Sequence, residues 1–204
     1  MEGIFFLLKA GGVAMYPLLF LSVVSWAVVV ERLINLRSSN FLPKNLKDVK
    51  NLLEKGDVDG AYKVLSLDQT PFGKILHRLL ENRIKENLSK RELMEMARVE
   101  IDLLVPKVEK NIAILSTIAS LSPLIGLFGT ITGLIKVFRA FSLEQSETAL
   151  NLLSSGIGEA LVAAATGLAV AIPALFFYWV FRIWGNSLLY RLEEELFEFL
   201  KVFP

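Results

Sequence analysis

The sequence of 204 residues contains no cysteine and only one histidine, His77. Disulfides, thiolate catalysis and thiolate metal sites are therefore excluded, and so is a site that needs several histidine ligands from one chain. The charges nearly balance, with 22 Lys and Arg against 21 Asp and Glu, which gives no reason to expect nucleic-acid binding. No metal ion or other cofactor is expected. An enzyme is the least favoured class, because the sequence offers little to catalyse with.

Charge is also missing from three long stretches, residues 10–30, 111–135 and 160–181. Each has 21 to 25 residues, and about 20 apolar residues suffice for a helix to cross the hydrocarbon core of a bilayer. The first stretch follows no basic segment, so it is expected to be a retained span and not a cleaved signal peptide. The sequence therefore predicts an all-α integral membrane protein with three transmembrane helices. The second and third are expected to be long and to extend into a cytoplasmic helical bundle.

The distribution of Lys and Arg predicts the orientation in the membrane. The block 31–110 holds 16 of them and the tail 182–204 holds three, against one before the first stretch and two in 136–158. Cytoplasmic segments carry the excess of positive charge. The predicted organisation is an external N-terminal segment (1–9), three transmembrane helices (10–30, 111–136 and 157–181), a cytoplasmic helical loop (31–110), a short periplasmic loop (137–156) and a cytoplasmic C-terminal helix (182–204).

Capping signals divide the cytoplasmic loop into helices. Gly56 is expected to end a short helix, Asp57 or Asp59 to cap the next, and Ser89 to open a capping box with Glu92. The helix after Ser89 is expected to run almost continuously into the second transmembrane helix. An apolar stripe in the C-terminal tail indicates either packing on the loop helices of the same chain or a ring of tails in an oligomer. Its members are Leu189, Leu192, Leu196, Phe199 and Phe203.

The second and third spans differ from the first in being rich in small residues. Small residues let helices approach closely in lipid, where packing drives association. Ordinary helix packing accounts for most of these positions and is compatible with a lined pathway or a face for a partner. The candidate positions for packing and for partner contact are Pro123, Gly126, Gly129, Gly133, Ala163, Ala164, Gly167 and Pro173.

Glu159 is the only ionisable residue between Glu147 and Arg182. Acidic residues inside spans usually face the bundle interior and are functional, although Glu159 is also close enough to the end of its span to be solvated or to cap the helix. Thr166 follows two turns later on the same stripe. Thr130 and Thr166 are both expected roughly 8–10 Å below the outer end, where their hydroxyls either form a polar ring in an oligomer or bond to their own helix. Because no titratable group lies near mid-membrane, a proton path would need one from another polypeptide.

Two motifs carry a resemblance to a known family. Residues 123–130 read Pro-Leu-Ile-Gly-Leu-Phe-Gly-Thr, and residues 156–163 read Gly-Ile-Gly-Glu-Ala-Leu-Val-Ala, followed by Gly167 and Pro173. They resemble the second- and third-span signatures of the ExbB/TolQ/MotA proton-channel family, and the three spans are similar to its ExbB/TolQ branch. The resemblance implies a homopentameric ring in the bacterial inner membrane around two copies of a single-span ExbD/TolR-like subunit with a membrane aspartate. Such a motor would use the proton gradient to energise outer-membrane or envelope processes through a TonB/TolA-like protein.

The resemblance also assigns residues. Thr130 falls on the family's second-span pore threonine and Glu159 on its third-span glutamate. Ala164 stands where the family often has a second pore threonine, and Thr166 is the candidate replacement. Trp179 stands where asparagine is common. Whether the chain has the role of ExbB or of TolQ stays open, and so does whether the coupling ion is H⁺ or Na⁺. The alternatives are a non-conducting membrane scaffold that recruits partners through its loop and tail, and a flagellar-type stator, which the three-span count disfavours.

Overall fold

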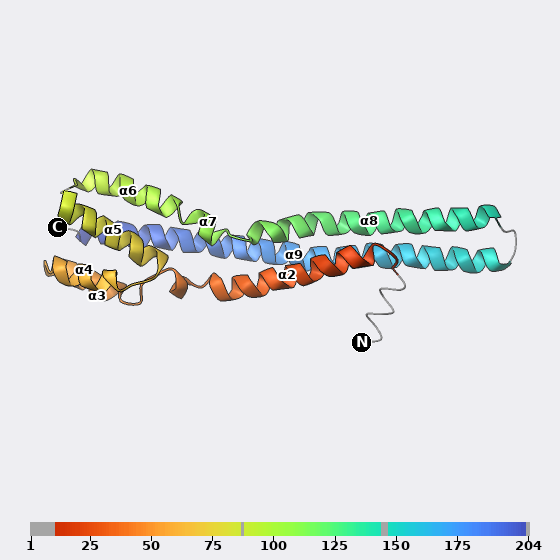
Figure 1. The fold of residues 1–204 in the computed structure, drawn as a ribbon, viewed down its shortest axis with the longest axis horizontal. Helices are drawn as coiled ribbons and strands as arrows, with labels where there is room; N and C mark the ends of the chain where they lie inside the picture. The colour runs from red at the N-terminus through yellow and green to blue at the C-terminus, as the bar shows by residue number, and fades with distance from the viewer. Residues whose placement is uncertain (1–10, 87, 144–146, 203–204) are drawn as a thin grey trace. The chain divides into compact units, whose positions relative to one another are not determined.

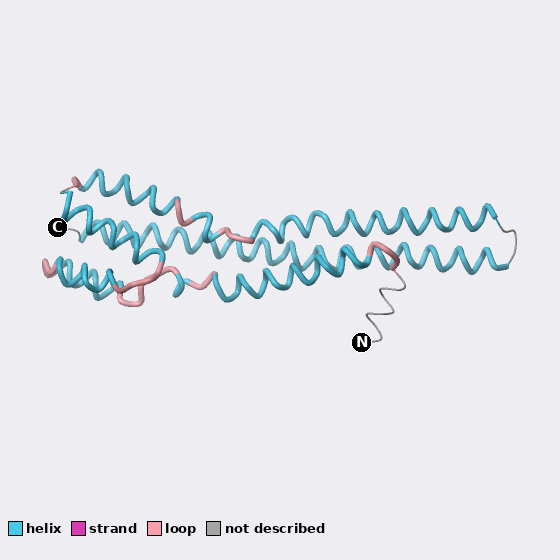
Figure 2. Tube along the Cα trace, viewed as in Figure 1, coloured by secondary structure: helices cyan, strands magenta, loops and turns pink. Residues whose placement is uncertain are grey.

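The computed structural model describes residues 11–86, 88–143 and 147–202, and every regular element in these ranges is a helix (Figures 1 and 2). Three helical segments are long and apolar enough to cross a membrane, at Met15–Asn35, Ile112–Arg139 and Leu153–Val202. The predicted all-α fold with three transmembrane helices is therefore confirmed. In chain order the elements are α2 (Met15–Asn35), the 3-10 helix η1 (Ser38–Asn40), α3 (Leu46–Glu54), α4 (Val58–Ser66), α5 (Pro71–Glu86), α6 (Lys90–Asp102), α7 (Val105–Val108), α8 (Ile112–Leu143) and α9 (Glu147–Val202).

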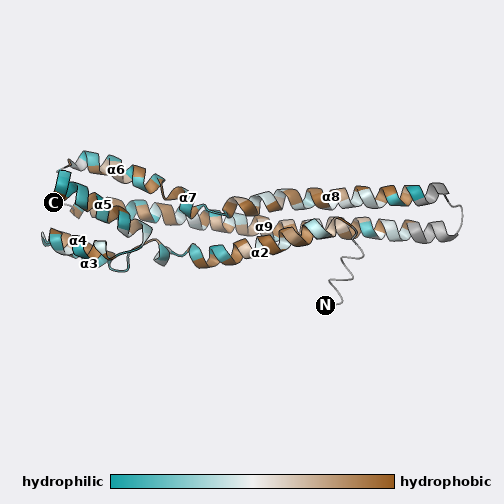
Figure 3. Ribbon diagram, in the orientation of Figure 1, coloured by the Kyte–Doolittle hydropathy of each residue, from teal (hydrophilic) through white to brown (hydrophobic). Residues whose placement is uncertain are grey.

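The chain folds into two compact units, which divide at the polar ends of the spans. One unit, called here the membrane unit, comprises Met1–Glu31 and Asn111–Val180, and the other, the polar unit, comprises Arg32–Lys110 and Phe181–Pro204. Figure 3 shows apolar residues along much of α2, whereas α4, α5 and α6 mix hydrophilic and hydrophobic residues. The single helix α9 contributes residues to both units, so the third helix is long, as predicted.

The helices of the polar unit begin and end where local signals place them. Asp57 accepts a hydrogen bond from the Gly60 amide at 2.9 Å and caps α4. Ser89 and Glu92 form the predicted capping box at the start of α6. Gly56 ends the α3 region with a positive φ of 76°, a conformation that glycine adopts without a steric cost.

The C-terminal part of α9 supplies apolar side chains to the interior of the polar unit. Leu192 and Phe199 are fully buried, and Leu196 is nearly so. Val49 of α3 and Leu76 of α5 are also fully buried. This burial supports the first of the two alternatives for the apolar stripe, packing within the same chain. Phe203 lies outside the described residues.

The predicted continuity between the helix after Ser89 and the second span is wrong. Helix α6 ends at Asp102, and the four-residue α7 separates it from α8. Pro106 has no amide hydrogen, so it cannot bond to the carbonyl of Asp102, where α6 stops. Asn111 then has a positive φ of 61°, a conformation that asparagine tolerates and that ends a helix before α8 begins.

The predicted periplasmic loop is largely helical. Helix α8 continues to Leu143 and α9 starts at Glu147, so most of the segment 137–156 belongs to one helix or the other. The physical reason is that this segment contains no proline and no glycine before Gly156. Whether these turns lie outside the membrane stays a prediction. The predicted external segment 1–9 lies outside the described residues.

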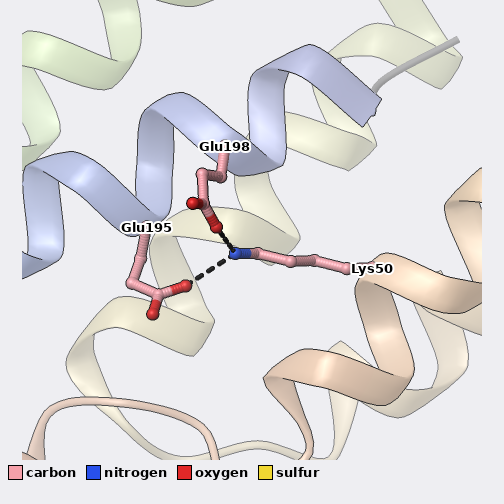
Figure 4. A network of polar contacts seen from close by, with 3 residues as sticks. All are labelled: Lys50, Glu195 and Glu198. Carbon is pink, nitrogen blue, oxygen red and sulfur yellow. Dashed lines mark hydrogen bonds and ion pairs between the residues drawn. The ribbon is translucent and has the colours of Figure 1, made fainter.

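Lys50 of α3 is held between two carboxylates of α9 in the polar unit (Figure 4). Its Nζ donates hydrogen bonds to Glu195 Oε2 at 2.7 Å and to Glu198 Oε2 at 2.5 Å. Burial alone would lower the pKa of the Lys50 ammonium, but the hydrogen bonds and charges of the two carboxylates outweigh it and raise that pKa above its ordinary value of 10.5. The cluster joins α3 to the C-terminal part of α9.

Replacing Lys50 by methionine is expected to lower the thermal midpoint of the purified protein at neutral pH. A group with a raised pKa stabilises the fold fully below its unfolded pKa and loses that contribution as the pH rises through the folded value. The difference between wild type and Lys50→Met should therefore shrink above pH 10.5. Lys47→Met, at an exposed position of the same helix, is the matched control. Equal effects of the two substitutions would show that the cluster of Lys50 with Glu195 and Glu198 does not stabilise the fold.

Candidate functional site between α8 and α9

Helices α8 and α9 of the membrane unit approach each other along a seam of small residues. A Cβ atom added at Gly167 would lie 2.7 Å from the carbonyl oxygen of Ser122, and one added at Gly126 would lie 3.0 Å from that of Ala163. Both distances are shorter than a normal contact, and backbone atoms cannot move aside as a side chain can. Gly126, Gly129, Gly133, Ala163 and Gly167 therefore serve close packing within the chain. Their contact with a partner stays a prediction.

The contacts along the seam fix the register of the two helices. A Cβ atom at Gly129 would lie 2.5 Å from Ala163 Cβ, and Gly126 lies against Gly167. Thr130 is therefore nearly level with Ala163, while Thr166 is level with Gly126. Four residues separate these levels on α8, which corresponds to about 6 Å along the axis. The prediction that both hydroxyls lie at one depth is wrong by about one helical turn, because depth was counted from the ends of the two uncharged stretches and these ends are not level in the seam.

Both threonine hydroxyls donate to carbonyl groups of their own helix. Thr130 Oγ1 lies 2.6 Å from the Leu127 carbonyl oxygen, and Thr166 Oγ1 lies 2.8 Å from that of Val162. This is the ordinary arrangement for such residues in a membrane helix. It commits the hydroxyl hydrogen and leaves oxygen lone pairs as acceptors for water or a hydrated proton. Their part in an ion pathway remains a prediction.

Glu159, about three turns into α9, has a partner that the sequence did not indicate. Lys136 Nζ of α8 donates to Glu159 Oε1 at 2.5 Å, and the glutamate side chain is only 20% exposed. Gly12, just before α2, lies on the other side, since a Cβ atom there would fall 1.9 Å from Glu159 Oε1. The carboxylate is thus ion-paired and packed among three segments. Lys136 could not be predicted as this partner, because its distance from Glu159 depends on the register of α8 against α9.

Both candidate prolines lie inside spanning helices. Pro123 interrupts the hydrogen-bond ladder of α8 and Pro173 that of α9. Each lacks an amide hydrogen, so the carbonyl four residues earlier loses its usual helical partner. Ala164 lies on the seam, with its Cα atom 3.3 Å from the position of a Cβ atom at Gly126. The residue that replaces the family threonine therefore packs its backbone against α8.

These features define a class of protein, a multi-pass helical membrane protein whose second and third spans form a tightly packed, hydroxyl-bearing pair. The sequence model of the MotA/TolQ/ExbB proton channel family matches residues 68–194, more than half of the chain. The chain belongs to this family, and it is a multi-pass protein of the bacterial inner membrane.

Named relatives cover most of the chain. The putative biopolymer transport protein ExbB-like 3 of Synechocystis sp. is 33% identical over 180 residues, which are 85% of this chain and 82% of the relative. The Tol-Pal system protein TolQ of Haemophilus influenzae is 28% identical over 79% of this chain and 74% of its own length. The biopolymer transport protein ExbB of Pseudomonas putida is 29% identical over 83% of this chain, which spans about half of that relative (52%). The similarity places the chain in the ExbB/TolQ branch.

Proposed function

We propose that this chain is a ring-forming subunit of a proton-driven motor that energises outer-membrane or envelope processes through a TonB/TolA-like protein. One observation carries the proposal. The chain belongs to a proton channel family, yet residues 111–135 and 160–181 of its two seam helices contain no Asp, Glu, His, Lys or Arg. A proton crossing the middle of the membrane needs a titratable group. A second polypeptide must therefore supply it, and a single-span ExbD/TolR-like subunit with a membrane aspartate has the required chemistry.

The proposed path uses three residues of this chain. By the register of the seam, Thr130 lies about one turn deeper than Glu159, and Thr166 lies about one turn deeper than Thr130, so acceptor oxygens are staggered along the pair of helices. Large apolar side chains of α8 and α9 are exposed in the single chain, among them Phe128 and Leu161. A homopentamer would enclose such surfaces around the partner in a largely apolar lumen. The charge distribution favours a periplasmic N-terminus and a cytoplasmic C-terminus.

A second candidate is a non-conducting scaffold that recruits partners through its cytoplasmic loop and tail. The observation in its favour is an open groove of about 580 Å³ between α6 and α9 in the polar unit, lined by apolar residues such as Met94, Ile101 and Phe197. A scaffold of this kind would need no proton path. Proton flux therefore separates the two candidates.

The test is proton flux into liposomes in response to an imposed gradient. The chain alone is expected to give no flux above that of empty liposomes, because it lacks a mid-membrane titratable group. Co-reconstitution with a single-span ExbD/TolR-like protein that carries a membrane aspartate should produce flux, and replacing that aspartate by asparagine should abolish it. No flux with the partner present would favour the scaffold. Full flux from the chain alone would contradict the requirement for a second titrating chain.

A further inference from the structure

The ion pair between Lys136 and Glu159 joins three segments of the membrane unit at one point. Glu159 comes from α9 and Lys136 from α8, with 2.5 Å between Nζ and Oε1. Gly12 precedes α2, and its α-carbon hydrogens face the same carboxylate, since a Cβ atom there would fall 1.9 Å from Oε1 and 2.8 Å from Cδ. The carboxylate thus occupies the space that a side chain at position 12 would take.

Two independent constraints require glycine at position 12. Its φ of +67° lies in the left-handed region, which side chains with a Cβ atom seldom adopt. The second constraint is steric, because a methyl group would displace the Glu159 carboxylate, a flexible group that can yield only by leaving Lys136. Gly11 packs nearby against Val162 of α9. The start of α2 is thereby fixed against α9 at the level of Glu159.

The negative charge of Glu159 is favourable at this junction only when a positive charge lies beside it. Glu159 is largely withdrawn from water, and an isolated carboxylate in such a place is costly. Lys136 compensates it while keeping about half of its own side chain exposed (56%), about two turns before the end of α8.

The geometry points to Lys136 and Gly12 as positioning residues for Glu159: together they hold its carboxylate as an ionic junction that fixes the start of α2 against α8 and α9. Lys136 acts through its charge and Gly12 through its lack of a side chain. The consequence for proton flux rests on the proposed function, whereas the consequence for the structure of α2 does not.

The structural consequence is tested by hydrogen–deuterium exchange of the full chain in lipid nanodiscs, followed at the amides of residues 13–16. Glu159→Gln, Lys136→Met and Gly12→Ala are each expected to speed exchange about fivefold, the factor that corresponds to the loss of one partly exposed ion pair. Lys136→Arg should restore wild-type exchange, because it keeps the charge. Arg139→Met, which removes the next cation along α8, is the matched control and should leave exchange unchanged.

A double variant distinguishes action through Glu159 from a separate structural role. If Lys136 acts through Glu159, Lys136→Met combined with Glu159→Gln should exchange no faster than Glu159→Gln alone. Additive effects would overturn the proposal, and so would a Lys136→Arg variant that behaves like Lys136→Met. An equal effect of Arg139→Met would also overturn it.

The flux measurement connects the junction to the motor. With the partner co-reconstituted, Lys136→Met is expected to lower proton flux at least about fivefold and Lys136→Arg to restore it. Normal flux in Lys136→Met with accelerated exchange would overturn the link to Glu159 in transport while leaving the structural junction in place. Absence of flux in the wild type with the expected exchange pattern would count against the proposed function and not against the junction.

Discussion

Replacing Thr130 by alanine is expected to reduce proton flux through the assembled complex about tenfold or more, while Thr132→Ala leaves flux near the wild-type value. The two hydroxyls are locally alike. Thr130 donates to the carbonyl of Leu127 at 2.6 Å and Thr132 to that of Gly129 at 2.9 Å. Two residues rotate a helix by about 200°, so they face different directions and only one can line a given path.

The expected tenfold loss of proton flux follows from the free-energy cost of leaving a polar species without a hydrogen-bond acceptor in a site that lacks water. That cost is about 1–3 kcal/mol, and 1.4 kcal/mol corresponds to a tenfold change in rate. Flux is measured in liposomes that contain matched amounts of chain and partner, with assembly checked by native electrophoresis. Equal flux in Thr130→Ala and wild type would remove Thr130 from the pathway. Equal losses in both variants would indicate a general effect on α8.

A methyl group at Gly167 is expected to destabilise the membrane unit by about 1–3 kcal/mol through overpacking, partly offset by about 1 kcal/mol from the better helix propensity of alanine. The Cβ atom would lie 2.7 Å from the Ser122 carbonyl oxygen and 3.1 Å from the Gly126 Cα atom, and both are backbone atoms. The two helices can accept it only by moving apart. Because the seam also sets the register, the displacement would change the level of Thr166 relative to Thr130.

Gly158 provides the matched control for this substitution. It lies on the same helix, but a Cβ atom there would have no described neighbour within 4 Å. Gly158→Ala is therefore expected to leave the stability of the isolated chain unchanged or to raise it by up to about 1 kcal/mol. Unfolding of the detergent-solubilised chain by heat compares the two variants. A Gly167→Ala protein as stable as wild type would show that the seam is looser than its contacts indicate.

The features of the fold that follow from short stretches of sequence could be predicted. Three spans follow from three uncharged stretches, because a helix in lipid needs a minimum apolar length. Asp57 and Ser89 act as caps because a cap involves only residues within one helical turn.

Features that depend on distant residues could not be predicted in the same way. The helix break at Asn111 rests on a left-handed backbone conformation that asparagine permits but does not require. The pairing of Lys136 with Glu159 spans 23 residues and depends on how tightly α8 turns back into α9. The depths of Thr130 and Thr166 were misjudged because the register of α8 against α9 rests on contacts between residues far apart in the sequence.

Native mass spectrometry of the detergent-solubilised protein, produced with and without a single-span ExbD/TolR-like protein, tests the central claim most directly. A shared lumen requires a closed ring of identical chains, and the missing titratable group requires a second polypeptide inside it. The predicted result is a homopentamer that gains two copies of the single-span partner when the two are produced together. A monomer or dimer that never retains such a partner would contradict the motor and leave the scaffold as the function.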